Sequence, residues 1–207
     1  NGCSPRADFP ELEEAGHDPS YVFRGYKADI YEGGHRIFFI ARWPGKITPG
    51  SESSETLCLT DLLATCAGIV GEKLPDNAGE DSYNILPVLL GDPTGKALRE
   101  ATVHHSINGS FSIRQGKWKL ELCPGSGGWS EPRPGTDEVK DLPPVQLYDL
   151  ENDIEETINV HDEHPEVVEE LKTLLEEYIV RGRSTPGLPQ RNDTGNDWDE
   201  LGWMREG

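Results

Sequence analysis

The feature that most constrains the fold of this 207-residue chain is a mainly apolar run at positions 37–43, IFFIARW. Gly34 precedes the run and Pro44 follows it, so the run has the length and the boundaries of a β-strand. A strand without polar alternation is typical of a strand buried on both faces, as in a parallel sheet. We therefore expect an α/β domain in the first part of the chain.

The loop before this run has the composition of an anion-binding loop. Gly33 and Gly34 can take positive φ angles or let another backbone approach closely. Residues 24–46 contain five basic and two acidic side chains, a net charge of +3, whereas the whole chain carries 19 Lys and Arg against 38 Asp and Glu, a net −19. A basic loop in an acidic chain indicates an anion site beside a sheet edge.

The overall charge and hydropathy argue against nucleic acid and a membrane as partners. Most of the negative charge lies late, because residues 131–207 hold 21 acidic and 7 basic residues. Attraction to nucleic acid needs a basic surface, so nucleic acid is a poor candidate partner. No run of about 18 apolar residues occurs, and we expect no contact with a membrane through a spanning helix. The chain begins with neither methionine nor an apolar signal segment, and we expect it to be a fragment.

The order of the expected elements suggests two folded parts followed by a tail. Residues 1–98 are expected to form the last piece of an α/β domain, with a helix over 61–70 that ends at Gly71. Residues 99–181 are expected to form a smaller α+β subdomain, an antiparallel sheet with one packing helix. Its predicted strands lie near 111–114, 117–122 and 145–148, its hairpin turn at 115–116 and its helix at 165–181. Residues 182–207 are expected to form an acidic tail.

The segment around the glycine pair resembles a known family. Residues 25–45, GYKADIYEGGHRIFFIARWPG, are similar to the GxKxxxYEGGxRxPxxxxWPG segment in the C-terminal portion of the type I, formylglycine-dependent sulfatases. These enzymes are the arylsulfatase group of the alkaline phosphatase superfamily, in which an Asp-Asn-Gly turn precedes the segment, as Asn1-Gly2 does here. The similarity continues through 60–75, 81–91 and 145–160. Phe38 replaces the proline of the family pattern.

The resemblance implies roles for four residues. Lys27 would be a catalytic residue that contacts the sulfate, and the side-chain oxygen of Asn1 would bind calcium. Alone, an Asn-Gly pair is a turn and a loop lysine is solvated, so the assignment depends on their combination with the glycine-pair segment. Arg36 would brace the site through hydrogen bonds without touching sulfate. His105 is a candidate substrate contact, although a packed or partly exposed strand histidine is an equally common role.

The resemblance also implies the chemistry. The family hydrolyses sulfate monoesters with calcium and a formylglycine nucleophile, which is made from Cys or Ser within Cys-x-Pro-x-Arg. That motif is absent from the 207 residues, and in Cys3-Ser4-Pro5-Arg6 the arginine comes one position early. We therefore expect the N-terminal half of the same protein to supply the nucleophile, and the chain alone to be inactive.

Two other functions remain open at this point. The chain could belong to a phosphonate or phosphate monoester hydrolase of the same superfamily, or it could be a noncatalytic binding module. For the sulfatase reading we expect a sulfated small molecule or carbohydrate as substrate, and the resemblance implies a periplasmic or extracellular location.

Overall fold

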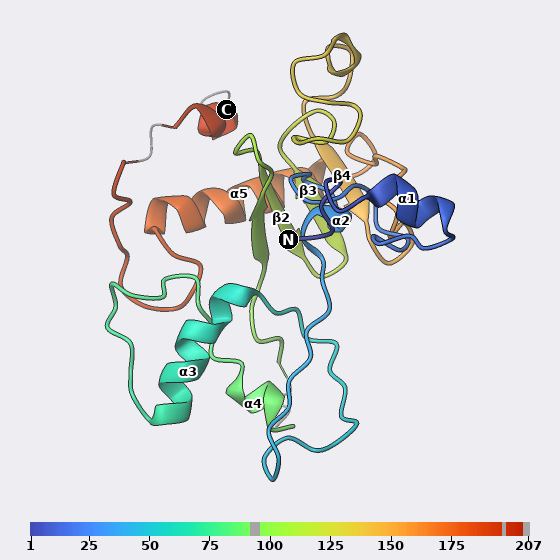
Figure 1. Cartoon of the computed structure of the whole chain (residues 1–207). Helices are drawn as coiled ribbons and strands as arrows, with labels where there is room; N and C mark the ends of the chain where they lie inside the picture. Colours follow the sequence, from blue (N-terminus) through green and yellow to red (C-terminus); the bar gives the residue numbers. More distant parts are fainter. Residues whose placement is uncertain (92–95, 196–197, 205–207) are drawn as a thin grey trace. The chain divides into compact units, whose positions relative to one another are not determined.

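The computed structural model describes residues 1–91, 96–195 and 198–204 (Figure 1). The chain forms two compact units. One contains Asn1–Phe38, Val103–Leu175 and the segment that begins at Asp199, and the other contains Phe39–Thr102 and Glu176–Trp198. Within the described ranges, no helix has the length and apolar character needed to cross a membrane.

Short helices and strands are joined by long loops. The α-helices are α1 (Phe9–Glu14), α2 (Glu32–His35), α3 (Leu62–Val70), α4 (Leu86–Leu89) and α5 (Pro165–Arg181). The 3-10 helices are η1 (Leu59–Asp61), η2 (Asp137–Val139) and η3 (Asp199–Met204). The strands are β1 (Thr102–His105), β2 (Phe111–Gln115), β3 (Trp118–Glu121) and β4 (Gln146–Asp149).

The four strands form one sheet in the order β1-β2-β3-β4. β2 pairs with β3 and β3 with β4, both antiparallel, and Ile113, Leu120 and Leu147 lie in register at the centre with no exposed surface. The β2–β3 hairpin turns through Gly116, whose φ of 57° is the left-handed conformation that glycine adopts without strain. The three predicted strands are confirmed as β2, β3 and β4, and β1 is a fourth strand that was not predicted.

The two longer helices are also confirmed. α5 begins at Pro165, where the fixed φ suits a first turn, and it buries Val168, Leu171 and Leu175 along one face. α3 ends at Gly71, whose φ of 77° stops the helix. Helical spacing of apolar residues therefore located α5, and the stop at Gly71 located the end of α3.

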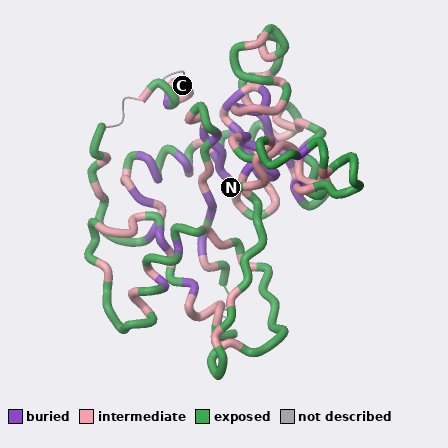
Figure 2. Tube along the Cα trace, viewed as in Figure 1, coloured by how far each residue is buried: buried purple, intermediate pink, exposed green. Residues whose placement is uncertain are grey.

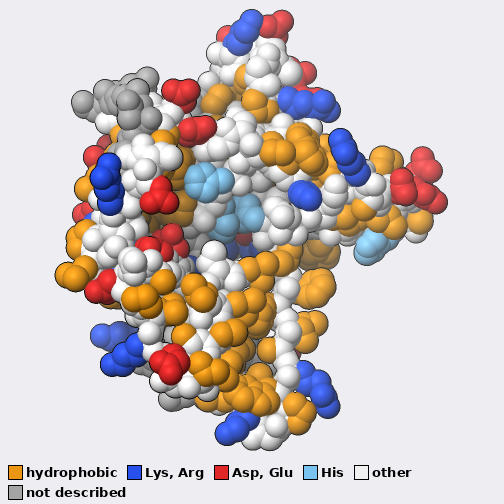
Figure 3. Space-filling model, turned by 60° about the vertical axis from the view of Figure 1, so that its left-hand side comes forward, with side chains coloured by type: hydrophobic (Ala, Val, Ile, Leu, Met, Phe, Trp, Pro, Cys, Tyr) orange, Lys and Arg blue, Asp and Glu red, His pale blue; other side chains and the backbone are white. Residues whose placement is uncertain are grey.

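The predicted strand over residues 37–43 does not form. Ile37, Phe38 and Ile40 are 46%, 86% and 82% exposed, and Figure 3 shows many hydrophobic side chains at the surface. A central strand needs neighbouring strands to pair its N–H and C=O groups, and no described strand of this chain lies beside the segment. The prediction of a buried strand at residues 37–43 is therefore wrong for this 207-residue chain.

The segment before α2 is anchored in the core of the first unit. Ile30 and Tyr31 are fully buried and join Cys123, Tyr148 and Leu150 in one apolar cluster. Figure 2 shows the buried positions of this unit gathered along its strands. The loop that carries the predicted sulfate-contacting lysine is therefore continuous with the buried core.

Candidate functional site

The first residues of the chain lie against the loop that holds Lys27. The Gly2 N–H donates to the Gly34 carbonyl oxygen at 2.8 Å, and the Lys27 N–H donates to the Cys3 carbonyl oxygen at 2.8 Å. Asn1 and Lys27, predicted from their sequence context, are thus brought to one region of the first unit. Both residues are exposed.

The glycine pair permits close packing of the loop on itself. A Cβ at Gly33 would collide with the carbonyl oxygens of Arg24 and Gly25, and one at Gly34 with the carbonyl oxygen of Asp29. Neither glycine has a positive φ. Of the two properties expected of the pair, close backbone approach is the one that the fold uses.

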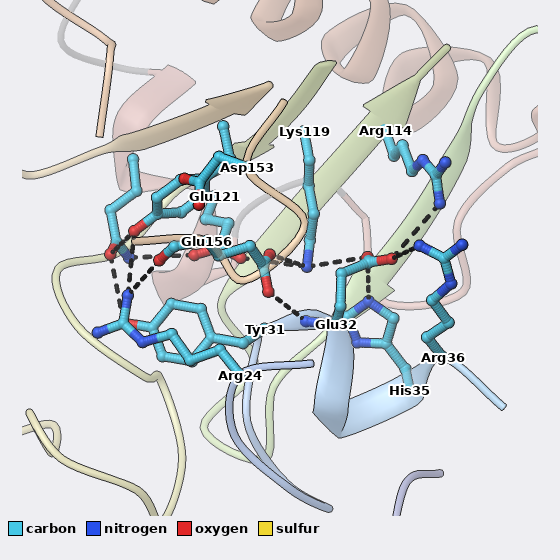
Figure 4. Close-up of polar contacts among 12 residues, drawn as sticks. Arg24, Tyr31, Glu32, His35, Arg36, Arg114, Lys119, Glu121, Asp153 and Glu156 are labelled. Carbon is cyan, nitrogen blue, oxygen red and sulfur yellow. Dashed lines mark hydrogen bonds and ion pairs between the residues drawn. The ribbon is translucent and has the colours of Figure 1, made fainter. Parts of the chain in front are cut away.

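Glu32, the first residue of α2, is buried among positive groups (Figure 4). Its carboxylate lies 3.0 Å from Arg36 Nη1, 3.4 Å from Arg114 Nη1 and 3.2 Å from Lys119 Nζ. Burial alone would raise the pKa of Glu32, but Lys119 above all, with His35 and Arg114, holds that pKa well below its ordinary value. Arg36 therefore contacts the α2 carboxylate, and it also lies 4.7 Å above the ring of Phe23.

Lys119 on β3 connects three carboxyl groups. Its ammonium has no exposed surface and lies 2.6 Å from Glu156 Oε1, 3.2 Å from Glu121 Oε1 and 3.2 Å from Glu32 Oε1. Burial would lower the pKa of Lys119, but the three carboxyl groups raise it. Burial raises the pKa of Glu121 well above its ordinary value. We call these four residues the Lys119 cluster.

Glu156 completes the N-terminus of α2. Its Oε2 accepts the Glu32 backbone N–H at 2.6 Å, and this matters because the N-cap residue, Tyr31, makes no side-chain capping bond. Glu156 has a φ of 53°, an uncommon conformation for a residue other than glycine. Arg24 donates to the Glu156 carbonyl oxygen at 2.8 Å and stacks 3.9 Å above the Tyr31 ring. The loop after β4 therefore fixes α2 in place.

Two histidines stack beside α2. The rings of His35 and His104 are 3.9 Å apart at an angle of 15°. Among the described residues, both nitrogens of His35 and Nδ1 of His104 are buried without a hydrogen-bond partner, and His35 Nε2 lies 3.5 Å from Glu32 Oε1. Burial, with the charge of Lys119, lowers the pKa of His35 to about 4. Burial and the neighbouring His35 also lower the pKa of His104 well below its ordinary value. The pair is therefore neutral at pH 7.

His105 points away from this pair. It is exposed, its Nδ1 lies 3.2 Å from the Gly109 carbonyl oxygen, and its ring is 4.1 Å from that of Phe111. Because side chains alternate along a strand, β1 directs His104 and His105 to opposite faces. The role proposed for His105 in substrate contact stays a prediction.

The Lys119 cluster was not found from the sequence. Lys119 and Glu121 alternate with apolar residues in β3, a pattern that normally places charged side chains in solvent. Glu156 lies in a loop, and only its position within the segment 145–160 could have drawn attention to it. Burial of opposite charges on the second sheet face is visible only in three dimensions.

The side chains around Asn1 do not form a complete metal site within the described part of the chain. Within the described residues, no group of three or more His, Cys, Asp or Glu side chains is placed to hold a metal ion. Asp29 accepts three backbone N–H groups and Glu32 is paired with basic side chains, so both nearby carboxylates are engaged. The Asn1 side chain is exposed, and its hard oxygen suits calcium as one ligand of several.

Comparisons with known proteins identify the relatives of the chain. No protein-family model matches it. It is 38% identical over 170 residues to an N-acetylgalactosamine-6-O-sulfatase of Bacteroides thetaiotaomicron, a match that covers 80% of this chain and 32% of the relative. It is 35% identical over 170 residues to human arylsulfatase A, covering 75% and 32% respectively. The chain thus spans about a third of the length of the curated relatives that it matches.

Solved structures agree with these relatives. A Bacteroides thetaiotaomicron 6S-sulfatase structure, reported in work on the metabolism of multiple glycosaminoglycans, superimposes with a TM-score of 0.67 at 34% identity over 82% of this chain and 34% of that one. The structure of Ps i-CgsB with k-i-k-neocarrahexaose has a TM-score of 0.54 at 19% identity over 81% and 34%, which shows a shared fold. The predicted fold class, a C-terminal α/β piece followed by an antiparallel sheet and a packing helix, is confirmed. These matches identify the chain as a sulfatase homologue that corresponds to the C-terminal portion of an arylsulfatase-group enzyme.

Proposed function

We propose that this chain forms part of a sulfatase that hydrolyses sulfate monoesters, and that Lys27 and Asn1 are its contributions to the reaction centre. The proposal is carried by the two backbone hydrogen bonds that bring residues 1–3 against Lys27 and Gly34. The Lys27 side chain is exposed, and a flexible ammonium can serve as a point charge for a sulfonyl oxygen.

The distribution of ion pairs supports different roles for Lys27 and Lys119, which belong to the same unit. Lys119 is buried among three carboxyl groups and holds α2. Within the described part of the chain, no carboxylate forms an ion pair with Lys27. Its positive charge therefore remains available to an incoming tetrahedral anion.

The remaining parts of the reaction centre would come from outside these 207 residues. Asn1 would hold calcium through its amide oxygen, together with ligands from the N-terminal half of the protein, and the ion would supply positive charge beside the sulfate. The nucleophile, a formylglycine, would also belong to that half, since Cys-x-Pro-x-Arg does not occur here.

The exposed apolar segment at residues 37–43 supports the proposal of an N-terminal half that packs against this chain. Phe38 and Ile40 expose more than four fifths of their surface, although their sequence is that of a buried strand. We propose that the N-terminal half provides the neighbouring strands that cover residues 37–43. A periplasmic or extracellular location, implied by the family resemblance, completes the proposal.

The proposed substrate is a sulfated carbohydrate. Its support lies in the names of two relatives, an N-acetylgalactosamine-6-O-sulfatase at 38% identity and a 6S-sulfatase structure from work on glycosaminoglycans at 34% identity. The net charge of −19 would slow the approach of long polyanions at low salt, which favours a small sulfated sugar.

The test compares this chain with the complete enzyme that would contain it. We expect the complete enzyme to release sulfate from N-acetylgalactosamine 6-sulfate and the purified 207-residue chain to release none, because the nucleophile is missing. Turnover by the isolated chain would contradict the division of the reaction centre. Faster hydrolysis of a phosphate monoester than of the sulfated sugar by the complete enzyme would contradict the assigned reaction.

A further inference from the structure

We propose that Asp29 is a positioning residue that fixes Lys27 for sulfate binding, an inference that rests on the proposed function. The Asp29 side chain is buried, with 2% of the residue exposed. Its Oδ1 accepts the backbone N–H groups of Trp129 at 2.7 Å and Ser130 at 3.1 Å, and its Oδ2 accepts that of Tyr26 at 2.9 Å. One carboxylate therefore joins the residue before Lys27 to a loop 100 positions away.

The residue between Lys27 and Asp29 has a strained backbone. Ala28 has a φ of 94°, which residues other than glycine rarely adopt. Its carbonyl oxygen accepts the Ile107 N–H at 2.9 Å, and the Ile30 N–H donates to the Ser126 carbonyl oxygen at 2.8 Å. Such a conformation persists only where the surroundings impose it, and here bonds from two separate loops do so.

The loop at residues 126–130 fits closely against this turn. A Cβ at Gly128 would collide with the Asp29 carboxylate and with the Ala28 carbonyl oxygen, so a side chain there would force the two segments apart. The Tyr26 hydroxyl also donates to the Trp129 carbonyl oxygen at 3.2 Å. The loop at residues 126–130 therefore contacts both the Asp29 carboxylate and the Tyr26 side chain.

Lys27 is held from the other direction as well. Its N–H donates to the Cys3 carbonyl oxygen, so its main chain is tied to the segment that carries Asn1. The residue itself is exposed, so its ammonium can reach solvent. A fixed main chain at Lys27 limits the volume that its ammonium samples. The entropy cost of binding a sulfate oxygen is therefore lower. Loss of the Asp29 carboxylate would allow the main chain at Lys27 to move.

A double-mutant cycle in the complete sulfatase tests the inference. The measurement is the inhibition constant of inorganic sulfate, which reports binding of the anion without turnover of its ester. We expect Asp29→Asn to weaken sulfate binding about tenfold and Lys27→Ala to weaken it about 100-fold. Because Asp29 acts through Lys27, the double variant should bind sulfate as weakly as Lys27→Ala alone.

The matched control is Asp18→Asn, because Asp18 is exposed and its Oδ1 accepts the N–H of Ser20, two residues away, at 2.8 Å. This variant should keep the wild-type inhibition constant. Gly128→Ala leaves the Asp29 carboxylate in place but pushes the loop at residues 126–130 away from it, so it should weaken sulfate binding as Asp29→Asn does. It replaces Asp29→Asn in the test if Asp29→Asn does not fold.

The outcomes distinguish a failure of the positioning role from a failure of the proposed function. If Lys27→Ala weakens sulfate binding while Asp29→Asn and Gly128→Ala do not, the positioning role is overturned and the proposed function stands. A further loss when Asp29→Asn is added to Lys27→Ala also overturns it, because Asp29 would then act by another route. An unchanged constant in Lys27→Ala overturns the proposed function and, with it, the role of Asp29.

Discussion

The Glu156 carboxylate lies 2.6 Å from the backbone nitrogen of Glu32, so a loop residue after β4 caps the helix that follows Lys27. The same side chain contacts the Lys119 ammonium at 2.6 Å. One carboxyl group thus satisfies a helix N–H and a buried charge together. The C-terminal sheet and the candidate site loop are therefore parts of one hydrogen-bonded structure.

Removal of this carboxylate should destabilise the chain. Glu156→Ala leaves the Glu32 N–H without its partner and takes one negative charge from Lys119, and we expect the free energy of unfolding to fall by about 3 kcal/mol. Denaturant unfolding followed by tryptophan fluorescence measures the change. Glu155→Ala is the control, because Glu155 is exposed. Equal stability of the two variants would refute the capping role.

Removal of Lys119 should make the free energy of unfolding depend strongly on pH. Lys119→Met leaves Glu32, Glu121 and Glu156 together without their buried cation, at a cost of about 3–5 kcal/mol near pH 7. Without Lys119 the folded-state pKa values of Glu32 and Glu121 rise, so the stability that these two carboxyl groups contribute is present at low pH and lost as pH rises through those values. The variant should therefore recover part of its loss near pH 4.5. A constant difference from wild type between pH 4.5 and pH 8 would contradict this account.

The stacked histidines should weaken the fold below neutral pH. Burial and Lys119 lower the pKa of His35 from 6.5 to about 4, so between these values the unfolded chain binds more protons than the folded chain. The free energy of unfolding therefore decreases as pH falls through this window, by on the order of 2 kcal/mol for His35.

His35→Phe can keep the ring contact with His104 and removes the titration. Glu32, Lys119 and Arg114 remain charged around both variants, so the difference from wild type isolates the histidine. We expect thermal unfolding between pH 4 and pH 7 to show a smaller loss of stability in His35→Phe than in wild type. Parallel curves would exclude a contribution from His35.

Local patterns predicted the elements whose stabilising contacts lie close in sequence. α5 was located from helical spacing and Pro165, and the β2–β3 hairpin from alternation around Gly116. The strand expected over 37–43 failed for a physical reason, since it needs partners that the described chain does not contain.

The candidate site was only partly predictable. Family spacing pointed to Asn1 and Lys27, which the fold brings to one region. Lys119 could not be recognised, because its three carboxyl partners come from α2, from β3 itself and from the loop after β4. In β1, sequence alone could not decide which of His104 and His105 faces His35.

The central claim is that the Lys27 ammonium binds the sulfate of the substrate, and the value of kcat/KM for a sulfated sugar in the complete enzyme tests it most directly. We expect Lys27→Ala to lower kcat/KM by about 100-fold or more, because a charge that contacts the reacting anion is lost. Lys46→Ala, which removes an exposed lysine from the same basic segment, should leave the value unchanged. Equal values of kcat/KM for the two variants would contradict the account.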